Sequence, residues 1–93
     1  MSEAGYIYVM INTAMEGIVK VGRTTRDVHE RAKELSAATG IPTPFTVAYD
    51  AFFDDCVKAE EYVHALLEQR GYRISQNREF FSVPLNVVIK VVV

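Results

Sequence analysis

The stretch GYIYVMI, residues 5–11, is followed after a short interval by IVKVG, residues 18–22. In the first stretch, two tyrosines and a methionine alternate with aliphatic residues, which is the period of two expected for a strand. The interval NTAMEG is polar and contains Gly17, a natural turn point. It is too short for a helical crossover, so we expect the two strands to pair as an antiparallel hairpin.

Tyr8 and Lys20 are the two hairpin residues that an apolar core would not select. If Tyr8 pairs directly with Lys20, then Asn12 pairs with Glu16 and a three-residue loop remains, which is an allowed hairpin geometry. This register predicts that the phenol and the ammonium lie on the same face of the hairpin.

The rest of the chain is predicted to add helices and strands in alternation. We expect a helix within residues 23–40, a strand at 46–53, a helix within 54–71, a short strand at 79–83 and a final helix with Pro84 in its first turn. The predicted fold is α+β, with a small, mainly antiparallel sheet of three or four strands flanked by helices.

The first predicted helix places an arginine over the sheet. Thr24 or Thr25 is expected to accept its first backbone N–H groups, Asp27 stands at capping-box spacing from Thr24, and Gly40 lies beyond its end. An apolar stripe at helical spacing faces inward, and Arg31 falls at the edge of that stripe.

Glu60 falls inside the apolar stripe of the second long helix, whereas Glu61 lies on its water-facing side. A carboxylate on a buried face is costly unless a cation or several donors meet it. The candidates for that cation are Arg31, Lys20 or a metal ion. A purely structural salt bridge between Glu60 and Arg31 is the alternative.

Composition limits the classes of function. The 93 residues allow one domain, and 10 basic against 12 acidic residues give a net charge of -2. A domain that holds nucleic acid by charge alone is normally basic, so any cationic surface must be local. The lone Cys56 excludes an internal disulfide and fits a reducing compartment. With neither a signal pattern nor an apolar run near ~20 residues, we expect a cytoplasmic location and no membrane partner.

The end of the sequence, NVVIKVVV, is apolar and would be an aggregation hazard if it were exposed. We therefore expect residues 1–93 to be a single domain cut from a longer chain within a C-terminal helix. That expectation leaves room for an additional domain in the parent protein.

The ordered set of these segments resembles the GIY-YIG nuclease superfamily over roughly residues 5–83. The helix with Arg31, the segment AEEYVH and the closing REFF are similar to its bacteriophage-type DNA-binding branch, the Orf172-like or meiotically up-regulated gene branch. Lys20 departs from the motif, because the family has a second tyrosine there. Asn77 is the nearest candidate for the family's asparagine. The matching motif residues are Ile7 and Tyr8 in the first half and Val21 and Gly22 in the second.

The resemblance implies a metal-dependent DNA endonuclease with Tyr8, Lys20, Arg31 and Glu60 as catalytic residues. Glu60 would hold a single Mg²⁺ or Mn²⁺ ion, which would polarise the scissile phosphate. Tyr8 would orient or deprotonate the attacking water, with Lys20 favouring the phenolate. Arg31 would bind a non-bridging phosphate oxygen.

Further residues have both a functional and a structural interpretation. Tyr6, Arg23 and Arg26 are candidate DNA contacts, the alternatives being a core or rim tyrosine and solvated arginines. His64 is either a second metal ligand or a packing and hydrogen-bonding residue. Glu79 either bonds one of the site's cations or is solvated. A catalytically inactive DNA-binding module and a protein-interaction domain stay open as alternatives to the nuclease.

Overall fold

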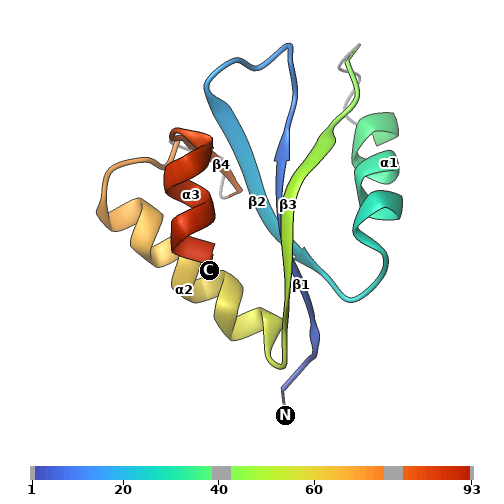
Figure 1. The fold of residues 1–93 in the computed structure, drawn as a ribbon, viewed down its shortest axis with the longest axis vertical. Coiled ribbons are helices and arrows are strands. Elements are labelled where there is room, and N and C mark those ends of the chain that lie inside the picture. The colour runs from blue at the N-terminus through green and yellow to red at the C-terminus, as the bar shows by residue number, and fades with distance from the viewer. Residues whose placement is uncertain (1, 39–42, 75–78, 93) are drawn as a thin grey trace.

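The computed structural model describes residues 2–38, 43–74 and 79–92 and contains four strands and three helices (Figure 1). The predicted α+β class and the predicted order of elements are both confirmed. The elements are β1 (Gly5–Ile11), β2 (Ile18–Thr24), α1 (Val28–Ala38), β3 (Thr46–Phe53), α2 (Cys56–Gln69), β4 (Phe80–Ser82) and α3 (Leu85–Val92).

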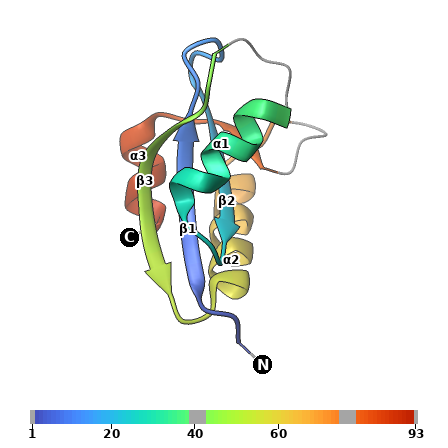
Figure 2. The same cartoon turned by 90° about the vertical axis from the view of Figure 1, so that its right-hand side faces the viewer.

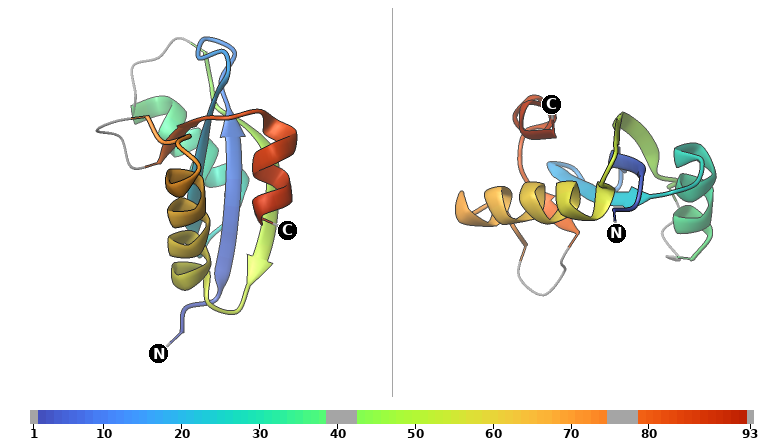
Figure 3. Two further views of the ribbon diagram at one scale, coloured as in Figure 1. Left: turned by 90° about the vertical axis from the view of Figure 1, so that its left-hand side faces the viewer. Right: turned by 90° about the horizontal axis from the view of Figure 1, so that it is seen from below.

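The sheet is antiparallel throughout and has the strand order β3-β1-β2-β4. Helix α1 covers one face, whereas α2 and α3 lie on the other (Figures 2 and 3). β4 is short and pairs only with the segment of β2 from Ile18 to Lys20. The second half of β2 therefore has no neighbouring strand on its outer side among the described residues.

The hairpin register differs from the prediction by two residues. Tyr8 pairs with Gly22, and Lys20 pairs with Met10. The expected pairing of Asn12 with Glu16 is wrong, because the connection is longer than a three-residue loop: Met15 N–H donates to the Asn12 carbonyl at 2.8 Å, and the turn continues to β2. A shift of two preserves the face of every side chain, so Tyr8 and Lys20 are diagonal neighbours on the same face, as predicted.

The central strand β1 separates two apolar cores. Ile7 and Val9 face α2 and α3, whereas Tyr8 and Met10 face α1. All four are at most 1 % exposed, because both faces of β1 are covered. Other members of the first core include Val21, Cys56, Val63, Leu67, Phe81 and Val88, and other members of the second are Val28, Ala32 and Phe45.

Both long helices begin at an aspartate. Asp27 itself caps α1 by accepting the Glu30 N–H at 3.0 Å, whereas Thr24 ends β2 and accepts the Arg26 N–H at 3.1 Å. The cap predicted at Thr24 or Thr25 is thus displaced to Asp27. Gly40, the predicted stop, lies outside the described residues.

Helix α2 has the ends that its sequence predicts. Asp55 accepts the Lys58 N–H at 3.1 Å, and Gly71 has a φ of +81° just beyond the last turn. Helix α3 starts one residue after Pro84, whose carbonyl accepts the Val88 N–H at 3.2 Å. Within the described part of the chain, no helix is both long enough and apolar enough to cross a membrane.

We predict that Phe81→Ala lowers the free energy of unfolding by about 3–5 kcal/mol, because Phe81 is fully buried and its removal leaves a cavity. Phe52→Ala is the matched control, since Phe52 is 57 % exposed, and it should change stability by less than about 1 kcal/mol. Urea unfolding followed by circular dichroism measures both. Equal effects of the two substitutions would contradict the assignment of Phe81 to the core.

Candidate active site

A polar hollow of about 240 Å³ opens beside the second half of β2, which pairs with β1 but not with β4. Its lining residues come from both faces of the sheet: Tyr8 and Arg31 from the face of α1, and Arg23 and Glu60 from the face of α2. Side chains from the two faces meet here because β4 covers the edge of β2 only as far as Lys20, which pairs with Phe80, the first residue of β4. Glu79, which directly precedes β4, completes the lining.

Gly22 allows the phenol to lie over the backbone of β2. A Cβ at this position would be 2.5 Å from the Tyr8 hydroxyl oxygen and 2.8 Å from Glu79 Oε1. Both distances are shorter than real Cβ contacts, so a side chain here would displace one of these groups. The phenol and the Glu79 carboxylate therefore converge on the space that only a glycine leaves open.

Each carboxylate of the hollow has its own cation. Arg23 Nε donates to Glu60 Oε1 at 3.0 Å, and Lys20 Nζ lies 3.0 Å from Glu79 Oε1. The structural alternative, a salt bridge between Glu60 and Arg31, is not seen among the described residues: Glu60 pairs with Arg23, and Arg31 bonds Glu34 at 3.2 Å. The alternative in which Glu79 binds a cation of the site is confirmed, and the cation is Lys20.

Lys20 does not act on Tyr8 as predicted. Its ammonium is nearly buried, with a side chain 10 % exposed, and is bound between the Glu79 carboxylate and the Phe80 ring, 4.7 Å from the ring centre. Burial raises the pKa of the Tyr8 phenol, the Glu79 charge raises it further, and the hydrogen bond with Arg31 lowers it only in part. The net shift is upward, so the phenol is protonated at neutral pH.

Arg31 contacts two oxygen acceptors on different elements. It bonds the Tyr8 hydroxyl and also Glu34 on its own helix. Burial works against the charge of Arg31, but these bonds outweigh it and its pKa is raised. Glu34 also accepts both terminal nitrogens of Arg26, at 2.7 and 2.8 Å, and the two arginines lower its pKa to about 2. Arg26, a predicted DNA contact, is thus exposed and paired on the surface beside the site.

His64 is a hydrogen-bonding residue. Its Nε2 lies 2.8 Å from the carbonyl oxygen of Val21, and its ring packs against Phe81 with centroids 5.2 Å apart. Val21 N–H in turn donates to the Glu79 carbonyl at 2.8 Å. Both backbone groups of Val21 are therefore hydrogen-bonded. The bond from its N–H holds the backbone of Glu79. This supports the packing interpretation of His64 over the metal-ligand interpretation.

Tyr6 does not line the hollow beside β2. Tyr6 packs edge-on against Phe52, with ring centroids 5.4 Å apart, and borders a separate hollow together with His29 and Asp50. It is a partly buried rim residue, which matches the structural alternative. Asn77 falls outside the described residues, so its proposed equivalence to the family asparagine stays a prediction.

The carboxylates of the hollow fit magnesium better than zinc. Among the described residues, no group of three or more His, Cys, Asp and Glu side chains could hold an ion by itself. Such a set does not suit zinc, which takes three or four protein ligands. Glu60 nevertheless offers one carboxylate to the hollow. Magnesium fits this arrangement, because it takes one or two carboxylates and fills its remaining positions with water and phosphate oxygens.

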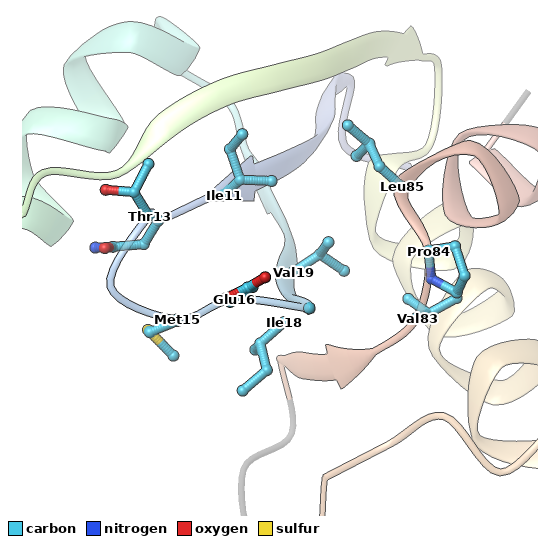
Figure 4. Close-up of a pocket in the computed structure, with 11 residues that line it drawn as sticks. Ile11, Thr13, Met15, Glu16, Ile18, Val19, Val83, Pro84 and Leu85 are labelled. Carbon is cyan, nitrogen blue, oxygen red and sulfur yellow. The ribbon is translucent and has the colours of Figure 1, made fainter.

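A second groove, of about 320 Å³, lies at the tip of the hairpin beside the segment that leads into α3 (Figure 4). Ile18, Val83 and Leu85 are among its apolar lining, and Glu16 is the charged residue among its described lining residues. The described lining of this groove is mainly apolar, whereas that of the hollow beside β2 is polar and charged. The polar hollow beside β2 is therefore the candidate active site.

Comparison with protein families matches residues 5–93 to the T5orf172 domain. This is a phage-type domain related to GIY-YIG-like nucleases, so the bacteriophage-type part of the sequence resemblance is confirmed. No curated protein and no solved structure matches the chain.

We predict that Gly22→Ala destabilises the protein by about 1–3 kcal/mol and displaces Tyr8, because the new methyl group overlaps the phenol and Glu79. Gly17→Ala is the control: its Cβ meets nothing within 4 Å, and only its φ of +77° opposes the substitution. Thermal unfolding measures the loss, and the ring resonances of Tyr8 report the displacement. An unchanged Tyr8 spectrum in Gly22→Ala would contradict the close approach.

We also predict that Tyr8 ionises only above pH 10, its ordinary value, because the folded state favours the neutral phenol. The stability contributed by that preference is complete below pH 10 and is lost as pH rises through the higher pKa of the folded state. Carbon NMR of labelled tyrosine, with Tyr8→Phe to assign the signal, measures the titration. A midpoint below 10 would instead indicate a cation acting on the phenol.

Proposed function

Because the chain belongs to the T5orf172 domain family, we propose that it is a divalent-metal-dependent DNA endonuclease domain of the GIY-YIG type. The observation that carries this proposal is the convergence of Tyr8, Arg31 and Glu60 on one hollow. These residues come from three different elements on two faces of the sheet, and a nuclease of this type needs a water-orienting group, a phosphate-binding cation and a metal-binding carboxylate.

Arg31 and Arg23 are the phosphate-binding groups of the proposed site. Both guanidinium groups border the hollow, and their planar donors suit the oxygens of a phosphate better than an ammonium does. Arg31 stays cationic while it bonds Tyr8, so a phosphate that contacts Arg31 also lies near the phenol. We assign Arg31 to a non-bridging oxygen, where negative charge builds up during cleavage.

Glu60 is the metal-binding residue of the proposal. Its carboxylate is largely buried, with a side chain 19 % exposed, and Arg23 holds its Oε1 in place. When bound, a Mg²⁺ or Mn²⁺ ion supplies polarisation of the scissile phosphate and stabilisation of the leaving oxygen. The protein contributes the position of the carboxylate and the adjacent arginine, which orients that carboxylate.

Tyr8 positions the attacking water in this proposal. A protonated phenol with a raised pKa is a poor base at neutral pH, but it can donate one hydrogen bond and accept another. Because Tyr8 lies beside Arg31, we expect the water to lie on the same side as the phosphate. Of the two roles considered for Tyr8, orientation is thus favoured over deprotonation.

DNA binding is expected to be weak and sensitive to salt. The net charge is -2, and several arginines near the site are paired with glutamates. Phosphate neutralisation supplies most non-specific affinity, so a few local cations give a shallow dependence on salt concentration. Arg23 and Arg26 remain our candidates for contacts to the DNA backbone, and Tyr6 remains a candidate contact at the rim.

A catalytically inactive DNA-binding module is the second candidate. It is favoured by the partners that Glu60 and Arg31 already have within the protein, Arg23 and Glu34, because a purely structural cluster would show the same ion pairs.

We predict that the protein nicks supercoiled plasmid DNA in the presence of Mg²⁺ or Mn²⁺, and that Glu60→Gln and Arg31→Ala each reduce the rate at least 100-fold. An oxyanion-stabilising donor is worth about 10²–10³ in rate, and loss of the metal-binding carboxylate costs a comparable amount or more. Glu61→Gln is the control, because Glu61 lies exposed on the same helix. Gel electrophoresis of plasmid nicking measures the rates.

The inactive module predicts a different result. In that case the wild type binds DNA in a salt-dependent manner, nicks nothing, and keeps its affinity in Glu60→Gln. EDTA treatment adds a check, since removal of the metal should abolish nicking by the wild type.

A further inference from the structure

The proposed nuclease lacks a proton acceptor among the residues considered so far. Hydrolysis requires a group that takes a proton from the attacking water, and the neutral Tyr8 phenol is unsuited to it. Arg23 and Arg31 are cations without an acceptor position. Glu60 is assigned to the metal ion. Among the described residues that line the hollow, only Glu79 is left.

Glu79 is placed where a base would have to be. Its Oε1 and the Tyr8 hydroxyl oxygen lie 2.8 and 2.5 Å from the point that a Cβ of Gly22 would occupy, so the two oxygens lie close to each other beside the glycine. The carboxylate borders the hollow that also contains Arg31 and Glu60. A water held by the Tyr8 hydroxyl is therefore within the reach of Glu79.

Two contacts fix the position of Glu79. The nearly buried ammonium of Lys20 lies 3.0 Å from Oε1, and the backbone carbonyl of Glu79 accepts the Val21 N–H at 2.8 Å. Its side chain is 39 % exposed, which leaves the carboxylate accessible from the hollow. Lys20 thus acts on the carboxylate, which a base requires in its ionised form, and not on the phenol.

We propose that Glu79 is the general base of the site and that Tyr8 holds the water from which Glu79 takes a proton. This proposal depends on the nuclease function proposed above. In the step, one O–H bond of water breaks and its proton passes to a Glu79 oxygen, while the water oxygen forms a bond to phosphorus. The P–O bond to the leaving ester oxygen breaks, and that oxygen takes a proton from solvent water. Glu79 then returns its proton to solvent.

The test compares Glu79→Gln with wild type in single-turnover nicking of supercoiled plasmid by Mg²⁺-loaded protein. We expect the rate to fall by about 10²–10⁴-fold, the usual contribution of a positioned base, while the affinity for plasmid DNA measured without metal stays within about two-fold. Glu61→Gln is again the matched carboxamide control. Tyr8→Phe should lose less activity than Glu79→Gln, because the water loses one hydrogen bond but keeps its base.

Chemical rescue separates a base from a structural partner. In Glu79→Ala the removed carboxylate leaves room for a small acid, so formate should restore nicking in proportion to its concentration. Formate should have no effect on Glu60→Gln. A residue that only holds Lys20 and β4 in place would not show a rate proportional to an added base.

A second variant distinguishes loss of the base from a folding defect in Glu79→Gln. Glu79→Gln leaves the ammonium of Lys20 without its carboxylate, so Lys20→Met combined with Glu79→Gln removes both charges together. This double variant should unfold at a temperature close to wild type and remain at least 100-fold slower.

The outcomes distinguish this proposal from the previous one. A wild type that nicks DNA while Glu79→Gln is less than ten-fold slower, or while formate fails to rescue Glu79→Ala, overturns the assignment of the base and leaves the nuclease function standing. A wild type that binds DNA but nicks nothing with either metal overturns both.

Discussion

The arrangement of the site depends on where β2 loses its outer neighbour. The pairing of β4 with β2 stops at Lys20. At the next residue, Val21, the edge of β2 makes two hydrogen bonds: its N–H donates to the Glu79 carbonyl, and its carbonyl bonds His64. The next residue is Gly22, which has no side chain to separate the two faces. Groups from α1 and α2, on opposite sides of the sheet, can therefore reach the same hollow.

Charge compensation is what the proposed function requires if an acidic domain is to offer cations to a phosphate. Each carboxylate at the hollow has a cation of its own: Arg23 for Glu60 and Lys20 for Glu79. Arg31 is shared between Tyr8 and the exposed Glu34. The pairs place a counter-charge beside each partly buried charged group, because burial of an isolated charge is costly. Surface pairs such as that with Glu34 are weak and exchangeable, so a phosphate can compete for the arginine.

Much of the fold could be predicted from local patterns in the sequence. The period-two stretches, the aspartate and glycine at the ends of α2, and the apolar stripes of both helices predict the elements and their order. The register of the β1–β2 hairpin could not be predicted in the same way, because it depends on the length of the connecting loop. The residue pattern does not fix that length, and the predicted register differs from the observed one by two residues. The face shared by Tyr8 and Lys20 was still predicted correctly, since a shift of two preserves it.

The partners within the site were harder to predict than its members. Tyr8, Arg31 and Glu60 were expected to meet and do so, but the pairing of Glu60 with Arg23 depends on α2 lying on the opposite face from α1, which helical periodicity does not specify. The upward pKa shift of Tyr8 has the same origin. It follows from burial and from Glu79, a residue far away in the sequence whose position is set by tertiary pairing.

The shortness of β4 links the integrity of the site to a small cooperative unit. Three residue pairs attach β4 to β2, fewer than join any other neighbouring strands of this sheet, and Glu79 is directly attached to them. Opening of so short a strand costs less free energy than unfolding of the central hairpin, so it is the first step by which native fluctuations would dismantle the site. The amide hydrogen of Val21, which is bonded to Glu79, is consequently a direct hydrogen-exchange probe of that opening.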